Sequence, residues 1–146
     1  MDWSTVAINR LATGARNKTI HVWEPHEAGT WVVNKNPAVA HTDSVEDIQW
    51  SPSEANVCLC FLGDLLSLDL DLFFFFIISQ VFASCSVDKT IKIWDVRQGV
   101  QKAALSVEAH ATDVNVIAWN RREQHLLVSG ADDGVFTVWN LRSFAT

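Results

Sequence analysis

Three stretches of this chain repeat one pattern of residues, and this repeat limits the possible folds more than any other feature. They read LATGARNKTIHVWEP at 11–25, FASCSVDKTIKIWDVR at 82–97 and LVSGADDGVFTVWNLR at 127–142. In each stretch an Asn or Asp stands six residues before a tryptophan, and the last two copies are 45 residues apart. A period of this length predicts one supersecondary unit that recurs along the chain and stacks on its neighbours.

A second set of tryptophans shows that the middle copy carries an insertion. The first and last copies place a second tryptophan, Trp3 and Trp119, 20 residues before the marked one. The middle copy places Trp50 a full 44 residues before Trp94, which is 24 residues more. Removing residues 57–80 restores the spacing. We therefore interpret this segment as an insertion into an otherwise regular repeat.

The inserted segment is strongly apolar, but it does not read as a membrane span. Of its 24 residues, 17 are apolar and none is Lys or Arg. Asp64, Asp69 and Asp71 interrupt it, and each would cost about 2.5–3.5 kcal/mol at the centre of a bilayer. Its end, FFFFIISQ at 73–80, is what a translated pyrimidine tract and splice acceptor would encode. We interpret 57–80 as a translated intron, either retained in frame or included by an error in the gene model.

Short apolar runs bounded by turn residues make up the rest of the repeat and predict β structure. The predicted strands lie at 45–50, 81–86, 90–95 and 102–107 in the middle copy and at 114–119, 125–130 and 135–140 in the last. The segments VDKT and DDGV, which separate two of these runs in each copy, contain the Asp and Gly residues of tight turns. Three to four strands in about 45 residues match one blade of a β-propeller.

Together these features resemble the WD40 repeat family, whose signature corresponds to IWD at 93–95 and VWN at 138–140. The resemblance implies an all-β fold, namely a partial WD40 β-propeller with an apolar insertion in one blade. It would contain about two and a half antiparallel blades and would not be a closed ring. The first, middle and last blades are expected at about 3–40, 41–109 and 110–146.

The resemblance also implies a buried structural tetrad in each blade, in which a His, a Ser or Thr, an Asp and a Trp are joined by hydrogen bonds. Such a chain satisfies polar groups that would each cost about 1–3 kcal/mol if buried without partners. Matched by spacing, the expected tetrads are His41, Ser84, Asp88 and Trp94 in the middle blade and His110, Ser129, Asp133 and Trp139 in the last. In the first blade Thr13 and Trp23 fit, Asn17 replaces the Asp, and no His precedes them.

Composition and motifs favour a binding protein without catalytic chemistry. The formal net charge of −6 argues against direct binding to nucleic acid or to anionic membranes and favours basic partners. The three cysteines, Cys58, Cys60 and Cys85, are too few for a disulfide framework, and a lone C-x-C lacks the four ligands of a zinc site. The sequence shows no phosphate-binding loop and no activated nucleophile. We expect no cofactor, no metal and no enzymatic activity.

One class of partner follows from a finer resemblance. The segments HTDSVEDIQWSP at 41–52 and DVNVIAWNRRE at 113–123 are similar to a nuclear and nucleolar branch of the family that is related to histone-binding WD proteins. This similarity implies a scaffold or chaperone for histones, or for a ribosomal protein in ribosome biogenesis, located in the nucleus and nucleolus. Four acidic residues at the blade rims would contact the basic client: Asp43, Glu46, Asp113 and Asp132.

Two alternatives stay open from the sequence. Residues 82–97 resemble the sixteen-residue box through which some WD40 proteins dock on the adaptor of cullin-type ubiquitin ligases, which would make the chain a substrate receptor. Arg97 and Arg142 would then contact the adaptor, although many WD repeats end in W-D-x-R simply as well-formed blades. Since a propeller closes with about 4–8 blades, the chain is alternatively a truncated product without a function.

Overall fold

In the computed structural model, residues 1–4, 10–52 and 81–143 are described, and their strands form three antiparallel sheets. The first sheet contains β1 (Asp2–Trp3), β2 (Leu11–Gly14), β3 (Ile20–Pro25) and β4 (Trp31–Val33). The middle sheet contains β5 (Val45–Trp50), β6 (Val81–Ser86), β7 (Thr90–Asp95) and β8 (Leu105–Glu108). The last sheet contains β9 (Val114–Trp119), β10 (Leu126–Ala131) and β11 (Phe136–Asn140). Strands that follow one another in sequence are paired in every sheet.

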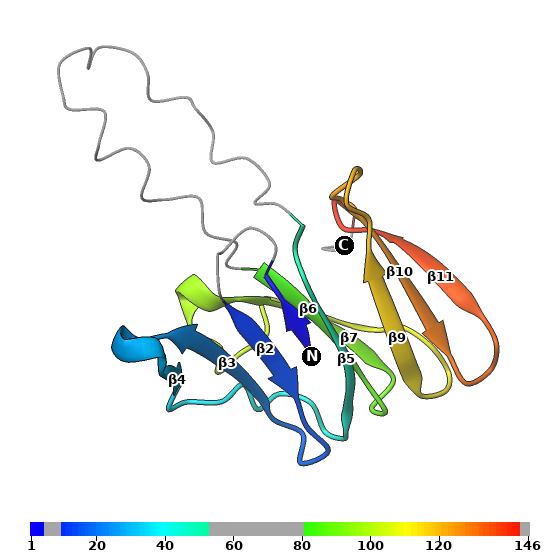
Figure 1. Ribbon diagram of the computed structural model, residues 1–146. Helices are drawn as coiled ribbons and strands as arrows, with labels where there is room; N and C mark the ends of the chain where they lie inside the picture. Colours follow the sequence, from blue (N-terminus) through cyan, green and yellow to red (C-terminus); the bar gives the residue numbers. More distant parts are fainter. Residues whose placement is uncertain (5–9, 53–80, 144–146) are drawn as a thin grey trace, which may run out of the picture.

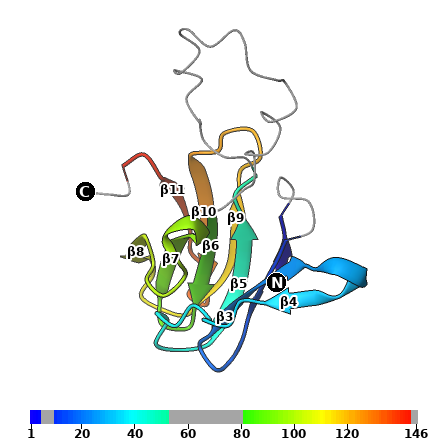
Figure 2. The same ribbon diagram turned by 90° about the vertical axis from the view of Figure 1, so that its left-hand side faces the viewer.

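The three sheets lie side by side in a curved row, and the middle sheet lies between the other two (Figures 1 and 2). The strand β5 contacts both neighbours, β2 of the first sheet and β9 of the last. The described residues form an open arc of sheets that does not close into a ring. The predicted all-β fold of a partial propeller is therefore confirmed, and we refer to the sheets as the first, middle and last blades.

Most strands occur where the sequence pattern predicts them, and one does not. The strands β5, β6, β7 and β9 have the predicted bounds, while β10 and β11 begin one residue later. The outer strand of the middle blade is predicted at 102–107, whereas β8 begins only at Leu105. The chain first passes through the 3-10 turn η3 (Val96–Gln98) and through Gly99, which has a left-handed φ of 83°. Pairing therefore resumes only near Ala104, whose N–H donates to the Ile93 carbonyl at 2.8 Å.

The insertion at 57–80 lies outside the described residues, and so do Cys58 and Cys60. Its interpretation as a translated intron stays a prediction. Within residues 1–4, 10–52 and 81–143, no helix is long and apolar enough to cross a membrane. The same part of the chain brings together no group of three or more His, Cys, Asp or Glu side chains that could hold a metal ion.

The middle blade is covered on both faces, which explains why the residues of its central strands β6 and β7 are almost continuously buried. Alternate side chains of a strand point to opposite faces, so Phe82 faces the first blade while Ala83 faces the last. The first seam, between the first and middle blades, buries Ala12, Ile20, Val22, Val45, Ile48, Phe82 and Trp94. The second seam, between the middle and last blades, buries Ala83, Cys85, Ile91, Ile93, Val114, Ile117 and Leu127.

A glycine allows the close approach of the strands across the first seam. Gly14 lies on β2 opposite Ile20, which is the place that Cys85 takes opposite Ile91 in the middle blade. A Cβ atom on Gly14 would lie 2.6 Å from Val45 Cγ1 and 3.2 Å from Ile48 Cδ1. The distance to Val45 leaves no room for a methyl group in a close-packed interior, while the distance to Ile48 would require a small shift of that side chain. The first seam is therefore tighter at this point than the second, where the sequence tolerates a cysteine.

We expect Gly14→Ala to lower the free energy of unfolding by about 1–3 kcal/mol, because the new methyl group overpacks the first seam. Val45→Ala in the same background should recover part of the loss by removing the colliding atoms. Urea unfolding of the 146-residue chain measures both effects. Gly130→Ala is the matched control, since its Cβ would meet only Val116 Cγ1 at 3.1 Å. Equal losses at the two glycines would contradict the explanation.

Candidate functional site

The predicted tetrad of the middle blade is assembled from four separate elements. His41 lies in the loop before β5, Ser84 in the middle of β6, Asp88 in the β6–β7 turn and Trp94 on β7. The His41 Nδ1 atom lies 2.9 Å from Asp88 Oδ2, and Nε2 lies 2.7 Å from Ser84 Oγ. The Trp94 indole N–H donates to the same Ser84 Oγ at 2.8 Å. The loop, the turn and two strands are thus joined by one chain of hydrogen bonds.

The charge state of this chain follows from its partners. Burial alone would raise the pKa of Asp88, but hydrogen bonds from the Thr90 hydroxyl, the Thr42 N–H and His41 together lower it to about 2. Burial lowers the pKa of His41 and outweighs the attraction of the carboxylate. At neutral pH the carboxylate is ionised and the imidazole is neutral. His41 then donates from Nδ1 to Asp88 and accepts the Ser84 hydroxyl proton at Nε2.

The order Asp–His–Ser resembles that of a hydrolytic triad, but the serine is placed for support. Ser84 is 0% exposed, and so is Trp94 beside it. The serine oxygen already accepts the indole N–H, while its own proton is directed to His41. A nucleophilic serine would need an exposed oxygen and donors for an oxyanion. The arrangement of these residues stabilises the blade and offers no place for a substrate.

The last blade has two of the three hydrogen bonds that join the tetrad of the middle blade. His110 Nε2 lies 2.8 Å from Ser129 Oγ, and the Trp139 indole N–H donates to the same oxygen at 2.8 Å. Among the described residues, however, no hydrogen bond or ion pair joins His110 to Asp133. The Asp133 side chain is exposed and accepts the N–H of Val135 at 2.9 Å instead.

The difference between the two blades has a local cause. In the middle blade the Thr90 hydroxyl lies two residues after Asp88 and donates to its Oδ1 at 2.5 Å. The Thr42 N–H donates to its Oδ2 at 2.9 Å, so the carboxylate is held against the imidazole. Val135 takes the place of Thr90 in the last blade and has no hydroxyl to donate. The spacing of the sequence motif therefore predicts a hydrogen bond between His110 and Asp133 that the described part of the last blade does not contain.

The first blade replaces the tetrad with a shorter set of contacts. The Trp23 indole N–H donates to Thr13 Oγ1 at 2.9 Å, as the pattern predicts. Asn17 Oδ1 accepts the Thr19 hydroxyl at 2.6 Å, and His21 Nε2 lies 3.3 Å from the same hydroxyl oxygen. His21 was not predicted as part of this set, although it follows the repeated K-T-I motif at the position that Lys92 has in the middle blade. Its Nδ1 atom is buried and has no hydrogen-bond partner in the described part of the chain.

The four predicted client contacts lie at the end of the blades that carries the tetrad turns. Asp43 precedes β5 and Glu46 lies near its start, and both are exposed. Asp113 precedes β9 and is half-buried, while Asp132 is exposed in the β10–β11 turn. The Asp132 N–H donates to the Asp113 carbonyl at 3.1 Å, which brings the last two together. Exposed Asp133 follows directly and adds a third carboxylate to this place.

The last blade is polarised along its strands. Its tetrad end contains Asp113, Asp132 and Asp133, which we call the acidic end of the last blade. No Lys or Arg occurs between Lys102 and Arg121 or between 123 and 141. The basic residues Arg121, Arg122 and Arg142 follow the other ends of β9 and β11. Carboxylates gathered without cations in this way give a local negative field that a basic partner complements.

Two further carboxylates, neither of them predicted from the sequence, join the blades. Asp47 Oδ2 on β5 accepts the N–H of Ile117 in the last blade at 3.1 Å. Asp2 Oδ2 on β1 accepts the N–H of Trp50 in the middle blade at 2.8 Å, and its carbonyl accepts the Trp50 indole N–H at 3.1 Å. Asp2 lies one residue before a repeat tryptophan and Asp47 lies three before, so no fixed spacing reveals their common task.

The two predicted adaptor contacts differ in their surroundings. Arg97 donates through Nε and Nη2 to the two carboxylate oxygens of Asp95, both at 2.9 Å, and 57% of its side chain is exposed. These hydrogen bonds from Arg97 lower the pKa of Asp95. Arg142 is exposed, and its backbone N–H donates to Asn140 Oδ1 at 3.1 Å. In the middle blade the guanidinium is oriented by a carboxylate, while the last blade has an amide at that position.

The remaining cysteine of the described residues has no chemical role. Cys85 is 0% exposed within the second seam and forms no disulfide. Burial is the main cause that raises the pKa of its thiol to about 12. Since the thiolate is the nucleophile and the metal ligand, this side chain acts as a small apolar residue of the seam.

Comparison with known proteins agrees with the repeat and with the fold. A family model described as "WD domain, G-beta repeat" matches residues 35–95 and 101–140. Both matched segments end within or just after the strands that carry Trp94 and Trp139. The match covers most of the chain and includes the middle and last blades.

Three curated relatives are similar at moderate identity. The chain is 43% identical over 103 residues, 70% of its length, to "Protein HEAT STRESS TOLERANT DWD 1" of Arabidopsis thaliana. It is 45% identical over 108 residues, 74% of its length, to "Glutamate-rich WD repeat-containing protein 1" of Dictyostelium discoideum. It is 39% identical over 119 residues, 81% of its length, to "Ribosome assembly protein rrb1" of Schizosaccharomyces pombe. The matched part spans only 17%, 17% and 19% of these relatives.

We expect Asp88→Asn to destabilise the chain by about 1–3 kcal/mol, because a neutral amide weakens the contacts to His41, Thr42 and Thr90 and leaves buried polar atoms unpaired. Asp133→Asn is the matched control. In the described part of the chain its side chain forms no hydrogen bond with His110, so the cost of this substitution should stay within about 0.5 kcal/mol. Urea unfolding of both variants gives the comparison. Equal costs would contradict the structural difference between the two blades.

The hydrogen bonds between Asp88 and His41 predict how the stability of the protein depends on pH. Because burial lowers the pKa of folded His41, the unfolded chain binds this proton first, at a pKa of about 6.5. Stability is therefore fully present above that value and is lost as the pH falls below it. Asp88 has a pKa of about 2 when folded, so its contribution is lost at lower pH, below an unfolded value of about 3.9. Unfolding of wild type and His41→Gln from about pH 8 to about pH 5 should show a shallower slope for the variant; an unchanged slope would contradict the assignment.

Proposed function

Because this chain belongs to the WD40-repeat family, we propose that it acts as a protein-interaction scaffold whose acidic blade ends bind basic client proteins. The family match and the relatives support a scaffold of WD repeats. Blades of this kind offer loops and turns on a rigid frame, and binding residues commonly lie on such loops. The buried tetrad residues stabilise the blades, and the acidic residues at the rim would bind the client protein.

The acidic end of the last blade is the observation that carries the proposal. Asp113 and Asp132 are joined through the backbone, and Asp133 is exposed beside them. The neighbouring middle blade adds Asp43 and Glu46 at the same end. The carboxylates of Asp132 and Asp133 are exposed and no cation of the last blade offsets them, so they attract a partner that is rich in Lys and Arg.

The class of client follows from this charge and from the relatives. The Schizosaccharomyces pombe relative is named as a ribosome assembly protein. We assign histones or a ribosomal protein of ribosome biogenesis as the client, with action in the nucleus and nucleolus. The assigned role is non-enzymatic, and it needs neither a cofactor nor direct contact with nucleic acid.

A second candidate function uses the opposite ends of the strands. The Arg97 guanidinium is exposed and is held in place by the two oxygens of Asp95. A guanidinium held in this way is pre-organised, so little side-chain freedom is lost when an acceptor of a partner approaches it. Arg142 recurs at the equivalent place of the last blade. The two arginines suit a docking contact to the adaptor of a cullin-type ubiquitin ligase, which would leave the acidic end free for a client.

For the client, we expect the double variant Asp113→Asn/Asp132→Asn to weaken binding of a histone H3–H4 pair or of a basic ribosomal protein. The loss should be about 0.2–1 kcal/mol per carboxylate, as for exposed ion pairs, and should shrink as salt rises. Fluorescence anisotropy across a salt series measures it. The matched control, Glu27→Gln/Glu123→Gln, changes the net charge equally at sites away from the acidic end. Equal effects of the two double variants would contradict the proposed surface.

For the adaptor, we expect Arg97→Ala/Arg142→Ala to abolish capture of the purified adaptor by the immobilised chain, because both guanidinium contacts are lost. Binding of the basic client should remain unchanged. The control is Arg121→Ala/Arg122→Ala, which removes two exposed cations from the β9–β10 connection. Adaptor capture that survives the first pair of changes, or that never occurs with wild type, argues against this second function.

A further inference from the structure

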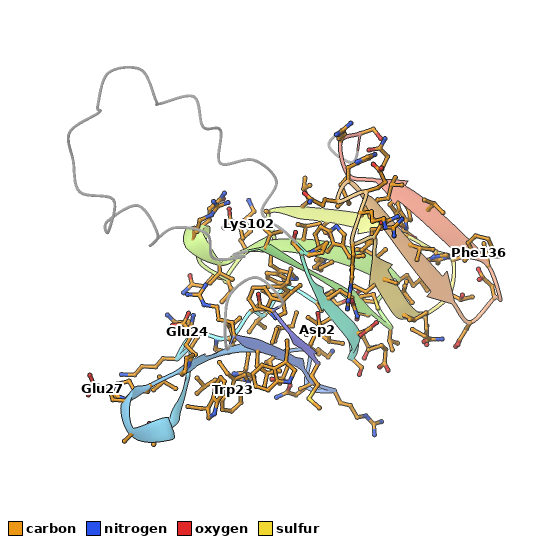
Figure 3. All side chains as sticks on the ribbon, turned by 45° about the horizontal axis from the view of Figure 1, so that its top comes forward. Asp2, Trp23, Glu24, Glu27, Lys102 and Phe136 are labelled. Carbon is orange, nitrogen blue, oxygen red and sulfur yellow. The ribbon has the colours of Figure 1, made fainter. Side chains whose placement is uncertain are left out.

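The first seam opens into a pocket at its outer edge, between β3, β4 and the turn η3. The pocket has a volume of about 110 Å³ and is lined by Val22, Glu24, Val32, Asn34 and Val96. A single water molecule needs only ~10–15 Å³, so the pocket has room for a side chain. Figure 3 shows Glu24 on the side of the first blade that faces the loop of Lys102, while Glu27 lies farther out. Both walls belong to blades of this chain, so the pocket is not one of the open faces at the two ends of the arc.

The repeat explains why the first seam has this pocket. In the second seam, Leu105 and Leu141 pack against the buried core at the equivalent place. In the first seam the same repeat positions hold Asn34 and Val96, which stand 11 and two residues after a repeat tryptophan. Val22 is also one carbon smaller than the isoleucine at its position in the middle blade. Three smaller side chains thus leave a space that the second seam fills with aliphatic carbon.

The lining combines an apolar wall with one carboxylate. Three valines form the wall, and Glu24 and Asn34 add polar atoms. Glu24 Oε1 lies 2.6 Å from Nη2 of Arg10, and 50% of the Glu24 side chain is exposed. A carboxylate has about four acceptor sites, so Oε2, which has no hydrogen bond or ion pair within the described residues, is open to a second cation. Asn34 Oδ1 accepts the N–H of Asn36 at 3.0 Å, which fixes this amide beside the pocket.

We propose that this pocket binds the lysine side chain of a partner protein. The aliphatic stem of the lysine packs along the three valines, and its ammonium group donates to Glu24 Oε2. Lysine suits such a site because it buries its stem on apolar surface while its charged head stays near water. A compact ammonium also fits beside Arg10 more easily than a second planar guanidinium. The leucines at the equivalent place of the second seam show that an aliphatic chain fits between two blades there.

The pocket is separate from the acidic end of the last blade. Glu24 lies near the end of β3, whereas the turn at Asn17 precedes the start of that strand. The pocket therefore lies toward the ends of the blades opposite to the tetrad turns. Arg97 at this end donates to both oxygens of Asp95 and leaves the Glu24 carboxylate to an incoming cation. A basic partner that reaches the pocket gains a contact that forms without the acidic end.

A titration followed by NMR tests the pocket in the 146-residue chain. The probe is Nα-acetyl-lysine amide, and the methyl signals of Val22, Val32 and Val96 report on binding. We expect saturable shifts of these methyl groups with a dissociation constant on the order of 1 mM. The matched probe, Nα-acetyl-norleucine amide, has the same stem without the ammonium group and should bind about two- to fivefold more weakly at equal ionic strength.

Two substitutions separate the charge of the pocket from its volume. Glu24→Gln should weaken lysine binding about two- to fivefold, because the ammonium loses its carboxylate. Its matched control is Glu27→Gln, which removes the same charge from the same blade outside the pocket and should leave binding unchanged. Val96→Leu places the leucine of the last blade in the pocket and should abolish the saturable shifts. Its control is Val39→Leu, which adds the same carbon at a side chain that is 59% exposed outside the pocket.

Amide spectra of each variant show whether it is folded, and Asn34→Leu replaces Val96→Leu if the latter fails that check. The proposal is overturned if wild type shows no saturable shifts of the three valines. It is also overturned if norleucine amide binds as well as lysine amide, since the pocket would then be apolar only. Lysine binding that survives in the folded pocket-filling variant would place the probe elsewhere on the surface and would equally reject the site.

Discussion

The hydrogen-bond chain from Asp88 through His41 and Ser84 to Trp94 fixes the strands, the loop and the turn of the middle blade relative to one another. The first and last blades both pack on this blade. The hydrogen-bond chain joins a loop, a turn and two strands whose residues are up to 47 positions apart. Every donor in it has an acceptor, so burial of these polar atoms costs little. Because the middle blade packs on both neighbouring blades, the hydrogen bonds that fix its strands also fix one side of each seam.

The same chain of hydrogen bonds also positions the acidic residues at the rim of the middle blade. Asp43 follows His41 by two residues, and its carbonyl accepts the hydroxyl of Ser86 at 3.2 Å. The acidic side chains at this end are therefore attached to a fixed frame, and they do not lie on long free loops. The last blade has a looser version, in which Asp133 faces solvent and joins the acidic end. One position of the repeat thus supports the fold in one blade and adds surface charge in the next.

The spacing of tryptophans, aspartates and histidines was enough to predict the strand order, the blade repeat and most tetrad contacts. These features are local or strictly periodic, so a single sequence displays them. Contacts across the seams were not predictable in this way. Asp2 and Asp47 perform one task from different repeat positions, and Gly14 is informative only beside Val45 of the next blade. The start of β8 also escaped prediction, because no turn residue marks where pairing resumes.

The sequence by itself determined that the chain is a set of β blades and which side chains form the buried tetrad of the middle blade. It did so because alternation along strands and a fixed period survive without knowledge of neighbours. Only the tertiary structure decided that Asp88 is held by Thr90 and Thr42 while Asp133 is released to the surface. It also decided that Ile91 is buried while Phe136, at the same repeat position, is exposed. The burial of a side chain depends on what packs against its face of the sheet. Equivalent positions of a repeat carry similar residues in every blade, so the sequence pattern does not show which of them are covered.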